Sequence, residues 1–525
     1  MDRYDAAVVG CGPTGLAAAA LLGRRGWHVA AFEKHPTRYS LPRAGHIDHE
    51  ILRIVQGVGA AAPIIDDNPE YDVYEWFNGA GETLLSFPFG EPSVSGFQSD
   101  YMIFQPVLDD ALYDAIARSE NAEACLGKAV IDLSPDGDGV LVRLAETTSD
   151  GTGRTVPTGR ESTVRADYVL VADGAGSTIR DELLRIPRED FGFNEAWLAI
   201  DVKLKRELPS GINGQWCDPS RPIYIGPLGK RYHRFECAVL PGESEAEVSS
   251  PDFAWRILGE HGVGDDDVEI FRQVVYWFES RVAERWRQGN VFLMGDAAHT
   301  MPPFMGQGLC SGVRDAANLA WKLDLVRRGK APASLLDTYE EERRPHVQRW
   351  IDLSIAVGRI SCTLDPALAA SRDDEFLRGV QPSLPEPPVL SGRMVGGLDG
   401  LPRRPQGEIF VQAPVSNAGR EALLHDLVGH GFLLVCLEGD PRPTLGEEAI
   451  ALLDRLGCTC WWLGGDGAGA LGDPTGRMRS WFADRGVVAA LVRPDYYVAA
   501  SSARVEEISP ALARFDRRLG RPPAA

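Results

Sequence analysis

The chain has no long hydrophobic run and no excess of basic residues. Its 525 residues include 54 Lys and Arg against 75 Asp and Glu, a formal net charge of −21. Nucleic acids and anionic membrane surfaces attract basic protein surface, so this balance argues against both as partners. No apolar stretch approaches the roughly 20 residues that span a bilayer, and the first strand pattern begins at Tyr4, which leaves no room for a signal peptide. The sequence therefore predicts a cytoplasmic protein.

The chain also lacks a cysteine pattern typical of redox or metal chemistry. Its nine cysteines are scattered and odd in number, which argues against a disulfide framework. Cys458 and Cys460 are the only close pair, and we interpret them as two small residues around Thr459 in a strand rather than as a redox or metal pair. There is no Cys-x-x-Cys. We therefore expect no metal site.

What the chain does have, at its N-terminus, is a nucleotide-binding turn. An apolar strand pattern from Tyr4 to Val9 leads into Gly10-Cys11-Gly12-Pro13-Thr14-Gly15 and an alanine-rich helix, Leu16 to Arg24. The first glycine permits the turn, the second lets N–H groups approach a pyrophosphate, and the third lets helix and strand pack closely. A second strand, Val29 to Phe32, ends at Glu33, where an acid accepts hydrogen bonds from ribose hydroxyls. This pattern fits FAD and NAD equally, and a glycine-rich turn in another α/β fold is the alternative.

Two later segments favour FAD by resemblance. Asp173-Gly174 follows an apolar run, and Gly295-Asp296 follows the apolar strand Val291 to Met294. The order and spacing of the three motifs resemble the single-component FAD-dependent aromatic hydroxylases, which are built like para-hydroxybenzoate hydroxylase. The resemblance implies that Asp296 binds the ribitol hydroxyls, and that Asp173 holds the pyrophosphate region and the visiting NAD(P)H. For Asp296 alone, a cap of the following turn is the alternative.

Within that family, the resemblance is closest to the branch of 3-(3-hydroxyphenyl)propionate hydroxylase and phenol hydroxylase. It is carried by Pro42–Glu50, His233–Glu236, Gly306–Ala316 and Leu336–Arg344, and it covers about residues 1–360. Flavin disulfide reductases share the N-terminal fold, but they need a Cys-x4-Cys pair that this chain lacks. The resemblance implies that FAD is bound tightly and without a covalent bond. The residues implied in binding it are Gly10, Gly12, Pro13, Thr14, Gly15, Glu33, Lys34, Arg43, Gln105, Asp173, Gly174, Gly295, Asp296, Pro303, Gly306, Gly308 and Leu309.

The activity implied by the resemblance is hydroxylation of a phenol, ortho or para to its hydroxyl, with NAD(P)H and O2 through a C4a-hydroperoxyflavin. We expect the turn that begins at Gly306 to open a helix whose free N–H groups stabilise charge on the reduced flavin, with Pro302 and Gly308 as catalytic positions beside the ring. No second Gly-x-Gly-x-x-Gly is present, which suits a transient NAD(P)H visit. The alternative is an FAD protein that binds and sequesters an aromatic ligand without hydroxylating it.

The region from 185 to 283 is rich in alternating patterns with aromatic residues, which predicts an antiparallel sheet that covers the flavin. Period two places His233 and Phe235 on one strand face and Arg234 on the other, so His233 and Arg234 do not both line the pocket. Because an unperturbed histidine titrates near pH 6.5, His233 is the candidate acceptor of the phenol proton. The candidate substrate-binding residues, for each of which core packing is the alternative, are Trp216, Tyr224, Phe235, Met301 and Phe304.

The predicted fold is α/β, with a Rossmann-like FAD-binding domain, an inserted antiparallel β-sheet substrate domain and a C-terminal thioredoxin-like domain. The FAD-binding parts are 1–75, 99–184 and 284–385, and the substrate domain comprises 76–98 and 185–283. Helices are predicted at Val313–Arg328 and Leu335–Val357. A proline-rich stretch at 381–388 marks the boundary of the C-terminal domain, 386–525, for which we expect a structural or oligomer-contact role. Whether the chain forms a homo-oligomer is left open.

Overall fold

The nucleotide-binding turn lies at the carboxyl edge of a parallel sheet in the computed structural model, which describes residues 1–380, 382, 384–396 and 404–520. Strand β1 (Arg3–Val9) lies between β2 (Val29–Glu33) and β10 (Thr155–Val171), and β17 (Val291–Leu293) pairs with the far side of β10. All four strands are parallel, and their apolar residues are buried on both faces. The remaining strands of this sheet are β7 (Ala122–Leu126), β8 (Lys128–Asp136), β9 (Gly139–Ser149) and β16 (Arg287–Gln288).

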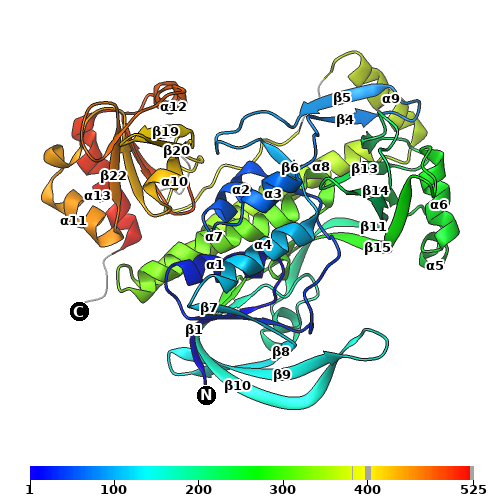
Figure 1. Cartoon of the computed structure of the whole chain (residues 1–525), viewed down its shortest axis with the longest axis horizontal. Coiled ribbons are helices and arrows are strands. Elements are labelled where there is room, and N and C mark those ends of the chain that lie inside the picture. The colour runs from blue at the N-terminus through cyan, green and yellow to red at the C-terminus, as the bar shows by residue number, and fades with distance from the viewer. Residues whose placement is uncertain (381, 383, 397–403, 521–525) are drawn as a thin grey trace.

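Three helices cover this sheet and bring distant segments together. Helix α1 (Pro13–Arg24) packs against α4 (Gln105–Ala117) and against the long α7 (Gln307–Arg327), which α8 (Thr338–Ser361) follows. The small side chains of the alanine run in α1 permit these close approaches, and all of them are buried. Figure 1 shows α7 and α8 crossing the centre of the molecule. Shorter elements of this part are β3 (His46–Asp48), α2 (His49–Gln56), α3 (Ala62–Asp67) and β6 (Asp100–Met102).

A second large sheet forms the roof predicted over the flavin. Its strands follow the order β18-β15-β11-β14-β13-β12-β4-β5. One face packs on α6 (Pro251–Glu260), which follows the short α5 (Glu245–Val248), and the other is turned toward the parallel sheet. The bounds are β4 (Val73–Phe77), β5 (Thr83–Pro88), β11 (Arg188–Leu204), β12 (Gly214–Trp216), β13 (Ile223–Leu228), β14 (Tyr232–Ala238), β15 (Val268–Ala283) and β18 (His299–Thr300).

The C-terminal lobe stands apart from the roof, with helices α2 and α7 between them (Figure 1). It contains a five-stranded mixed sheet in the order β23-β22-β21-β24-β25. Cys436, Cys458 and Cys460 are free and buried there, as expected for small core residues. The bounds are β19 (Pro414–Asn417), β20 (Arg420–Leu423), α10 (Leu424–Val428), β21 (Leu433–Cys436), α11 (Glu447–Leu456), β22 (Thr459–Leu463), β23 (Ala470–Leu471), α12 (Arg477–Arg485), β24 (Ala489–Val492), β25 (Val498–Ser502) and α13 (Ile508–Leu519).

A buried network of charges ties this lobe to α7 and α8. Arg493 donates to both carboxylate oxygens of Glu342 at 2.9 Å and to Asp495 at 2.5 and 2.9 Å, while Lys322 donates to Glu342 at 2.8 Å. Burial alone would raise the pKa of Glu342, but Arg493 and Lys322 lower it to about 2. Because all four side chains are almost completely buried, each charge depends on its partners in the network. We call Lys322, Glu342, Arg493 and Asp495 the buried network.

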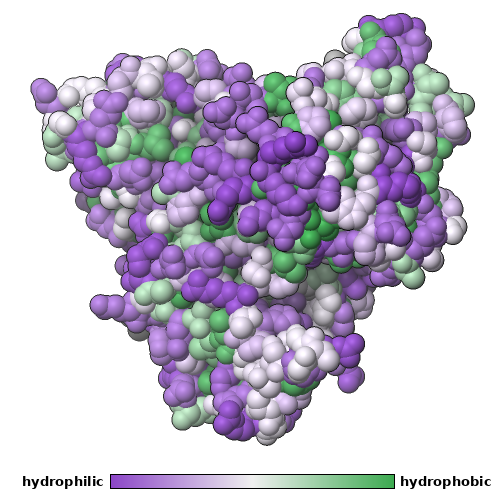
Figure 2. Space-filling view, turned by 45° about the vertical axis from the view of Figure 1, so that its right-hand side comes forward, coloured by the Kyte–Doolittle hydropathy of each residue, from purple (hydrophilic) through white to green (hydrophobic). Residues whose placement is uncertain are grey.

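The overall architecture confirms the predicted α/β fold class. Figure 2 shows a face covered mostly by hydrophilic residues. No single described helix is long and apolar enough to cross a membrane, although one pair, Ala333–Ser361 with Pro366–Leu377, satisfies length and composition together while bent by 102°. The proline-rich boundary predicted at 381–388 lies partly outside the described residues, which omit 381 and 383.

Candidate active site

The three glycine-rich segments meet at one place, where their backbones touch. A Cβ on Gly10 would collide with the Ala172 carbonyl, beside Asp173, and a Cβ on Gly15 would collide with the carbonyl of Gly10. Gly295 and Gly312 both lie against Thr14, so a Cβ on either would collide with the threonine hydroxyl. We call Gly10, Thr14, Gly15, Gly295 and Gly312 the glycine cradle. Segments more than 100 residues apart thus come together at the carboxyl edge of the parallel sheet.

The first turn of α1 opens from this cradle and suits an anion. Its N-cap is Gly12, no side chain caps its N–H groups, and Pro13 occupies the first turn. A Cβ on Gly12 would meet one atom group within 4 Å, the Arg43 guanidinium at 3.7 Å. Uncapped N–H groups, the helix dipole and a nearby guanidinium are what a pyrophosphate needs. Pro13 and Arg43 therefore both lie at this turn, and their role in binding the pyrophosphate stays a prediction.

Glu33 lies at the end of β2, next to the same turn. Its carboxylate accepts hydrogen bonds from the backbone N–H groups of Cys11 (2.9 Å) and His35 (3.0 Å). The side chain is half-buried, so lone pairs remain for ribose hydroxyls. Lys34 has an exposed side chain and contributes its backbone carbonyl to Thr147.

Two aspartates at the sheet edge have carboxylate atoms without protein donors. Asp173 is half-buried, and its Oδ1 atom is fully buried with no hydrogen-bond partner. Asp296 accepts no hydrogen bond from any described residue; water reaches it, yet partial desolvation by the surrounding protein raises the pKa of its carboxyl. The oxygens of the Asp296 carboxylate are therefore free to accept hydrogen bonds from a ligand. Both groups, with Gly174 in open space beside Asp173, fit a hydroxyl-rich ligand such as FAD.

The start of α7 forms the next wall. Gly306 is its N-cap in the left-handed conformation (φ 61°), and no side chain caps the first turn of Gln307, Gly308 and Leu309. Pro302 is buried and Pro303 opens the short helix before it. A Cβ on Gly306 would collide with the His46 ring, which therefore lies directly against this turn. The arrangement fits the predicted N–H groups for a reduced flavin.

A residue absent from the predicted set, Asp315, holds the Gly295 loop from below. Its carboxylate accepts from the Gly295 N–H at 3.0 Å, from His299 at 2.7 Å and from Arg343 at 2.9 Å. It is fully buried, and His299 and Arg343 outweigh burial to lower its pKa. Asp315 thus fixes the loop that presents Asp296. The charged pair Arg314–Asp315 within an otherwise largely apolar stretch of the predicted helix was the available sequence signal.

Gln105 is placed differently from the prediction of a direct flavin contact. Its side-chain oxygen accepts from the backbone N–H groups of Arg43 (3.1 Å) and Ala44 (2.9 Å), and its amide donates to Asp109 at 3.0 Å. It is 1% exposed. The residue therefore supports the loop that carries Arg43, because its side-chain oxygen accepts two backbone N–H groups of that loop.

The roof corrects three predicted pocket residues. His233 and Phe235 lie on the α6 side of β14, where His233 contacts Asn213 at 2.7 Å and Phe235 is fully buried in the core. Burial lowers the pKa of His233 to about 4. Trp216 faces the same side, with its ring 5.4 Å from His261 at the end of α6. His233 as the proton acceptor, and Phe235 and Trp216 as substrate contacts, were therefore wrong predictions, because the opposite strand face points to the flavin loop.

Tyr224, Met301 and Phe304 do lie on the inner side. Tyr224 pairs across the roof with Glu236, and its ring lies 6.3 Å from Tyr74. Met301 packs beside the start of α7, close to Gly308. Phe304 packs edge-on against Trp197 of β11 at 5.7 Å. They stay predicted substrate contacts.

The inner face of the roof also carries residues that the sequence pattern did not assign. Arg234 donates to Asp201 at 2.7 and 3.1 Å, to the Arg43 carbonyl at 2.8 Å and to the Pro42 carbonyl at 3.1 Å. Beside it on the same face is Glu236. Aromatic rings extend from there toward His46; we call Tyr71, Tyr74, Phe87, Phe89 and Tyr224 the aromatic wall. Charged residues alternating with apolar ones in a central strand were the signal for the inner face.

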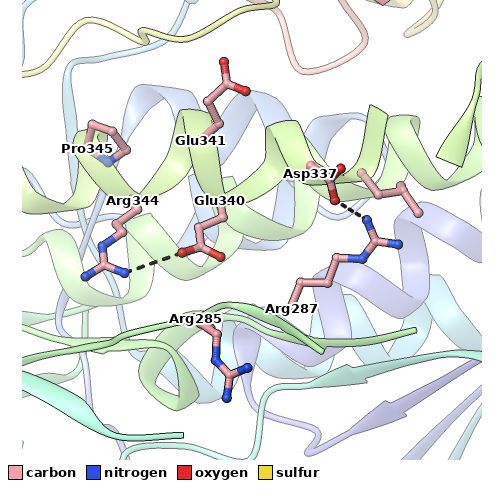
Figure 3. A pocket seen from close by; sticks show the side chains of 8 residues that line it. Arg285, Arg287, Asp337, Glu340, Glu341, Arg344 and Pro345 are labelled. Carbon is pink, nitrogen blue, oxygen red and sulfur yellow. Dashed lines mark hydrogen bonds and ion pairs between the residues drawn. The ribbon is translucent and has the colours of Figure 1, made fainter. Parts of the chain in front are cut away.

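A surface cleft of about 480 Å³ lies elsewhere, between the loop before β16 and α8. Figure 3 shows that charged side chains line it and that two pairs are engaged, Arg287 with Asp337 at 2.5 Å and Arg344 with Glu340 at 3.5 Å. None of the predicted site residues lines this cleft. Its paired charges do not suit an aromatic ring, so the candidate site is the glycine cradle with the two uncapped helix starts of α1 and α7.

Comparisons with known proteins agree with this geometry. Residues 3–354 match the family model of the FAD binding domain, and residues 407–517 match the HcaD C-terminal domain. The chain is 37% identical over 512 residues to a probable NADH-specific resorcinol 4-hydroxylase of Rhodococcus jostii (strain RHA1), covering 94% of this chain and 91% of that protein. It is 33% identical over 519 residues to a 3-(3-hydroxy-phenyl)propionate/3-hydroxycinnamic acid hydroxylase of Klebsiella pneumoniae (strain 342), with coverages of 94% and 91%. Aklavinone-11 hydroxylase, solved with FAD and aklavinone, shares the fold with a TM-score of 0.78 at 24% identity, covering 98% of this chain and 99% of that one.

Proposed function

The chain belongs to the FAD-binding-domain family of single-component aromatic hydroxylases, and from that premise we propose that it hydroxylates a single-ring phenol with NADH as reductant. It is an FAD-dependent monooxygenase that acts on a phenolic substrate with NAD(P)H and O2. The choice of a resorcinol-like ring and of NADH is supported by the name of the Rhodococcus relative. A cytoplasmic location stays a prediction, and whether the chain forms a homo-oligomer stays open.

We assign the cofactor to the glycine cradle and the segments around it. Glu33 binds the adenosine ribose, the start of α1 and Arg43 bind the pyrophosphate, and Asp296 binds the ribitol hydroxyls. Bound there, FAD supplies the hydride acceptance and oxygen activation that no amino-acid side chain provides. The carboxylate of Asp296 is the observation that carries the assignment, because it is exposed, accepts no hydrogen bond from a described residue and follows Gly295, which lies against Thr14 in the first turn of α1.

The protein contributes position, charge and exclusion of water. The N–H groups at the start of α7 stabilise negative charge at the ring, and Arg234 fixes the Pro42–Arg43 loop under the roof. The aromatic wall offers ring faces on which a phenol packs by offset or edge-on contacts. Asp315 and Gln105 keep the two cofactor loops in place from beneath.

The test is direct. Purified protein is expected to show flavin absorbance, and resorcinol is expected to stimulate its NADH oxidation and to gain one oxygen atom from isotopically labelled O2. Protein without flavin, or NADH oxidation that no phenol stimulates, would refute the proposal. Resorcinol that binds and perturbs the flavin spectrum but leaves with unchanged mass would favour the sequestering protein instead.

A further inference from the structure

Glu236 is a buried carboxylate without a donor on the inner face of the roof. It is 9% exposed, in the middle of β14, and no N–H or O–H of the described residues donates to it. Asp201, one strand away, is held by Arg234 in a two-point contact. A buried carboxylate costs free energy when it lacks hydrogen bonds. A buried carboxylate without a hydrogen-bond donor is typical of a functional site in which the bound ligand supplies the donor.

The direction of Glu236 follows from the strand alternation. Its neighbours on the same face are Arg234 and, across the pairing, Tyr224 on β13 and Ala199 on β11. Because Arg234 bonds the carbonyls of Pro42 and Arg43, this face looks toward the loop that carries Arg43 over the nucleotide turn. Glu236 therefore faces the space between the roof and the cofactor loops.

The aromatic wall connects Glu236 to the start of α7. The Tyr224 ring lies 6.3 Å from Tyr74, Tyr74 stacks on Phe89 at 5.5 Å, and Phe89 lies 5.9 Å from His46. His46 in turn contacts the Gly306 turn. The aromatic wall thus runs from Glu236 toward the turn at which the flavin ring is predicted to lie.

We propose that Glu236 is the catalytic residue that accepts the proton of the substrate hydroxyl during ring hydroxylation, an inference that rests on the proposed function. As the ring carbon ortho or para to the hydroxyl takes up an oxygen atom, the phenol O–H bond breaks. The proton passes to the Glu236 carboxylate, and the electron pair left on the phenol oxygen enters the ring. The C–H bond at the oxygenated carbon then breaks, its electron pair restores the aromatic ring, and the former phenol oxygen takes up a proton again. When the product leaves, the Glu236 carboxyl returns its proton to water. The oxygen and the reducing electrons come from O2 and NAD(P)H of the hydroxylation itself.

The groups around Glu236 adjust its basicity. Arg234 lies on its own strand, Asp201 on β11, Arg272 on β15 and Tyr224 on β13, with Tyr71 and Tyr74 beyond. Burial raises the pKa of Glu236 and outweighs the opposing effect of Arg234. Asp201 already neutralises Arg234, so Glu236 is not held in an ion pair. A carboxylate with a raised pKa is a stronger base at neutral pH, and activity that needs its ionised form rises as pH rises through that pKa.

The experiment compares Glu236→Gln with His233→Gln, which changes the opposite face of the same strand. Both are prepared as FAD holoproteins and assayed with resorcinol. For Glu236→Gln we expect hydroxylation to fall roughly 100-fold or more, the acidic limb of the kcat/KM profile to disappear, and FAD content to stay as in the wild type. His233→Gln is expected to keep the wild-type rate and the acidic limb. An unchanged rate and acidic limb in Glu236→Gln would overturn the proposal.

A series of substituted phenols separates proton acceptance from a structural effect. Electron-withdrawing groups ionise the hydroxyl without help, so the deficit of Glu236→Gln is expected to shrink with them. A deficit of equal size across the series contradicts a role in proton transfer.

Binding is measured separately, by titrating resorcinol against flavin absorbance. Loss of the hydrogen bond to the charged carboxylate is expected to weaken binding about tenfold or more. This titration tests the contact between Glu236 and the substrate even if the wild-type protein does not turn over resorcinol. Failure of turnover would refute the proposed function and not the binding role of Glu236. Unchanged resorcinol affinity in Glu236→Gln would count against Glu236.

Discussion

Asp296→Ala is expected to weaken FAD binding strongly while leaving the cofactor-free protein as stable as before. In the described structure the carboxylate accepts no hydrogen bond, and the short helix at Gly295–Ala297 has Met294 as its N-cap without any side-chain cap. The cap alternative therefore has no supporting contact. Removing Asp296 breaks no bond within the protein, and it relieves the desolvation that raises the pKa of this carboxyl.

The size of the loss follows from the two hydroxyl groups that a carboxylate can hold. A hydrogen bond to a charged group contributes about 1.5–3 kcal/mol. One such bond corresponds to roughly a 10-fold to 150-fold change in the dissociation constant. Asp296→Asn keeps an acceptor oxygen but not the charge, and we expect its affinity to lie between the wild type and Asp296→Ala.

The assay titrates FAD into apoprotein by fluorescence quenching and follows the melting temperature of the same samples without FAD. Asp265→Ala, at an exposed carboxylate of the roof, is the matched control and is expected to match the wild type in both. A normal FAD dissociation constant together with a lowered apoprotein melting temperature would refute the reasoning and leave Asp296 as a structural residue.

The glycine cradle and the buried network each give one more test. Gly312→Ala puts a Cβ into the Thr14 hydroxyl and 3.1 Å from the Gly295 Cα, so we expect the ratio of flavin to protein absorbance after purification to fall well below that of the wild type; full occupancy would contradict the cradle. Glu342 has its pKa lowered from 4.5 to about 2 by Arg493 and Lys322 against the effect of burial, so its stabilisation is complete above pH 4.5 and is lost as pH falls toward 2. The difference in denaturant-measured stability between wild type and Glu342→Gln is therefore expected to narrow over that window, and a constant difference would contradict the ionised network.

The local parts of the site could be predicted because each depends on neighbouring residues. The strand, glycine turn and helix of the first unit appear within a few residues of their predicted bounds, and Glu33 ends β2 as expected. Helix α7 begins six residues before the predicted Val313. Its early glycines disfavour helix on propensity alone, but close packing against Thr14 requires one of them, Gly312.

The parts that could not be predicted depend on long-range contacts. Strand β14 alternates His233 and Phe235 with Arg234 and Glu236, and both sets include groups that suit a pocket. Helix α6 packs on the face of β14 that carries Phe235, and the Pro42 and Arg43 carbonyls bind Arg234 on the other face. These contacts, which lie far along the chain, decide which face is turned toward the site. The pairing of Arg493 with Glu342 joins residues 151 apart, which no local pattern encodes.

The interleaved order of the parallel sheet has a consequence for how the chain is made. Val9 pairs with Val171, and Val171 pairs with Leu293, so the central strands are completed only when the segment after the roof has been synthesised. At about 5–20 residues per second, the ribosome needs on the order of ten seconds to move from β10 to β17. Throughout that interval, the edge of β10 that pairs with β17 has no partner strand, and such non-local pairing is slow to form. The hydroxylase is thus open to aggregation while it is being synthesised, and no N-terminal fragment that ends before β17 contains a complete cofactor sheet.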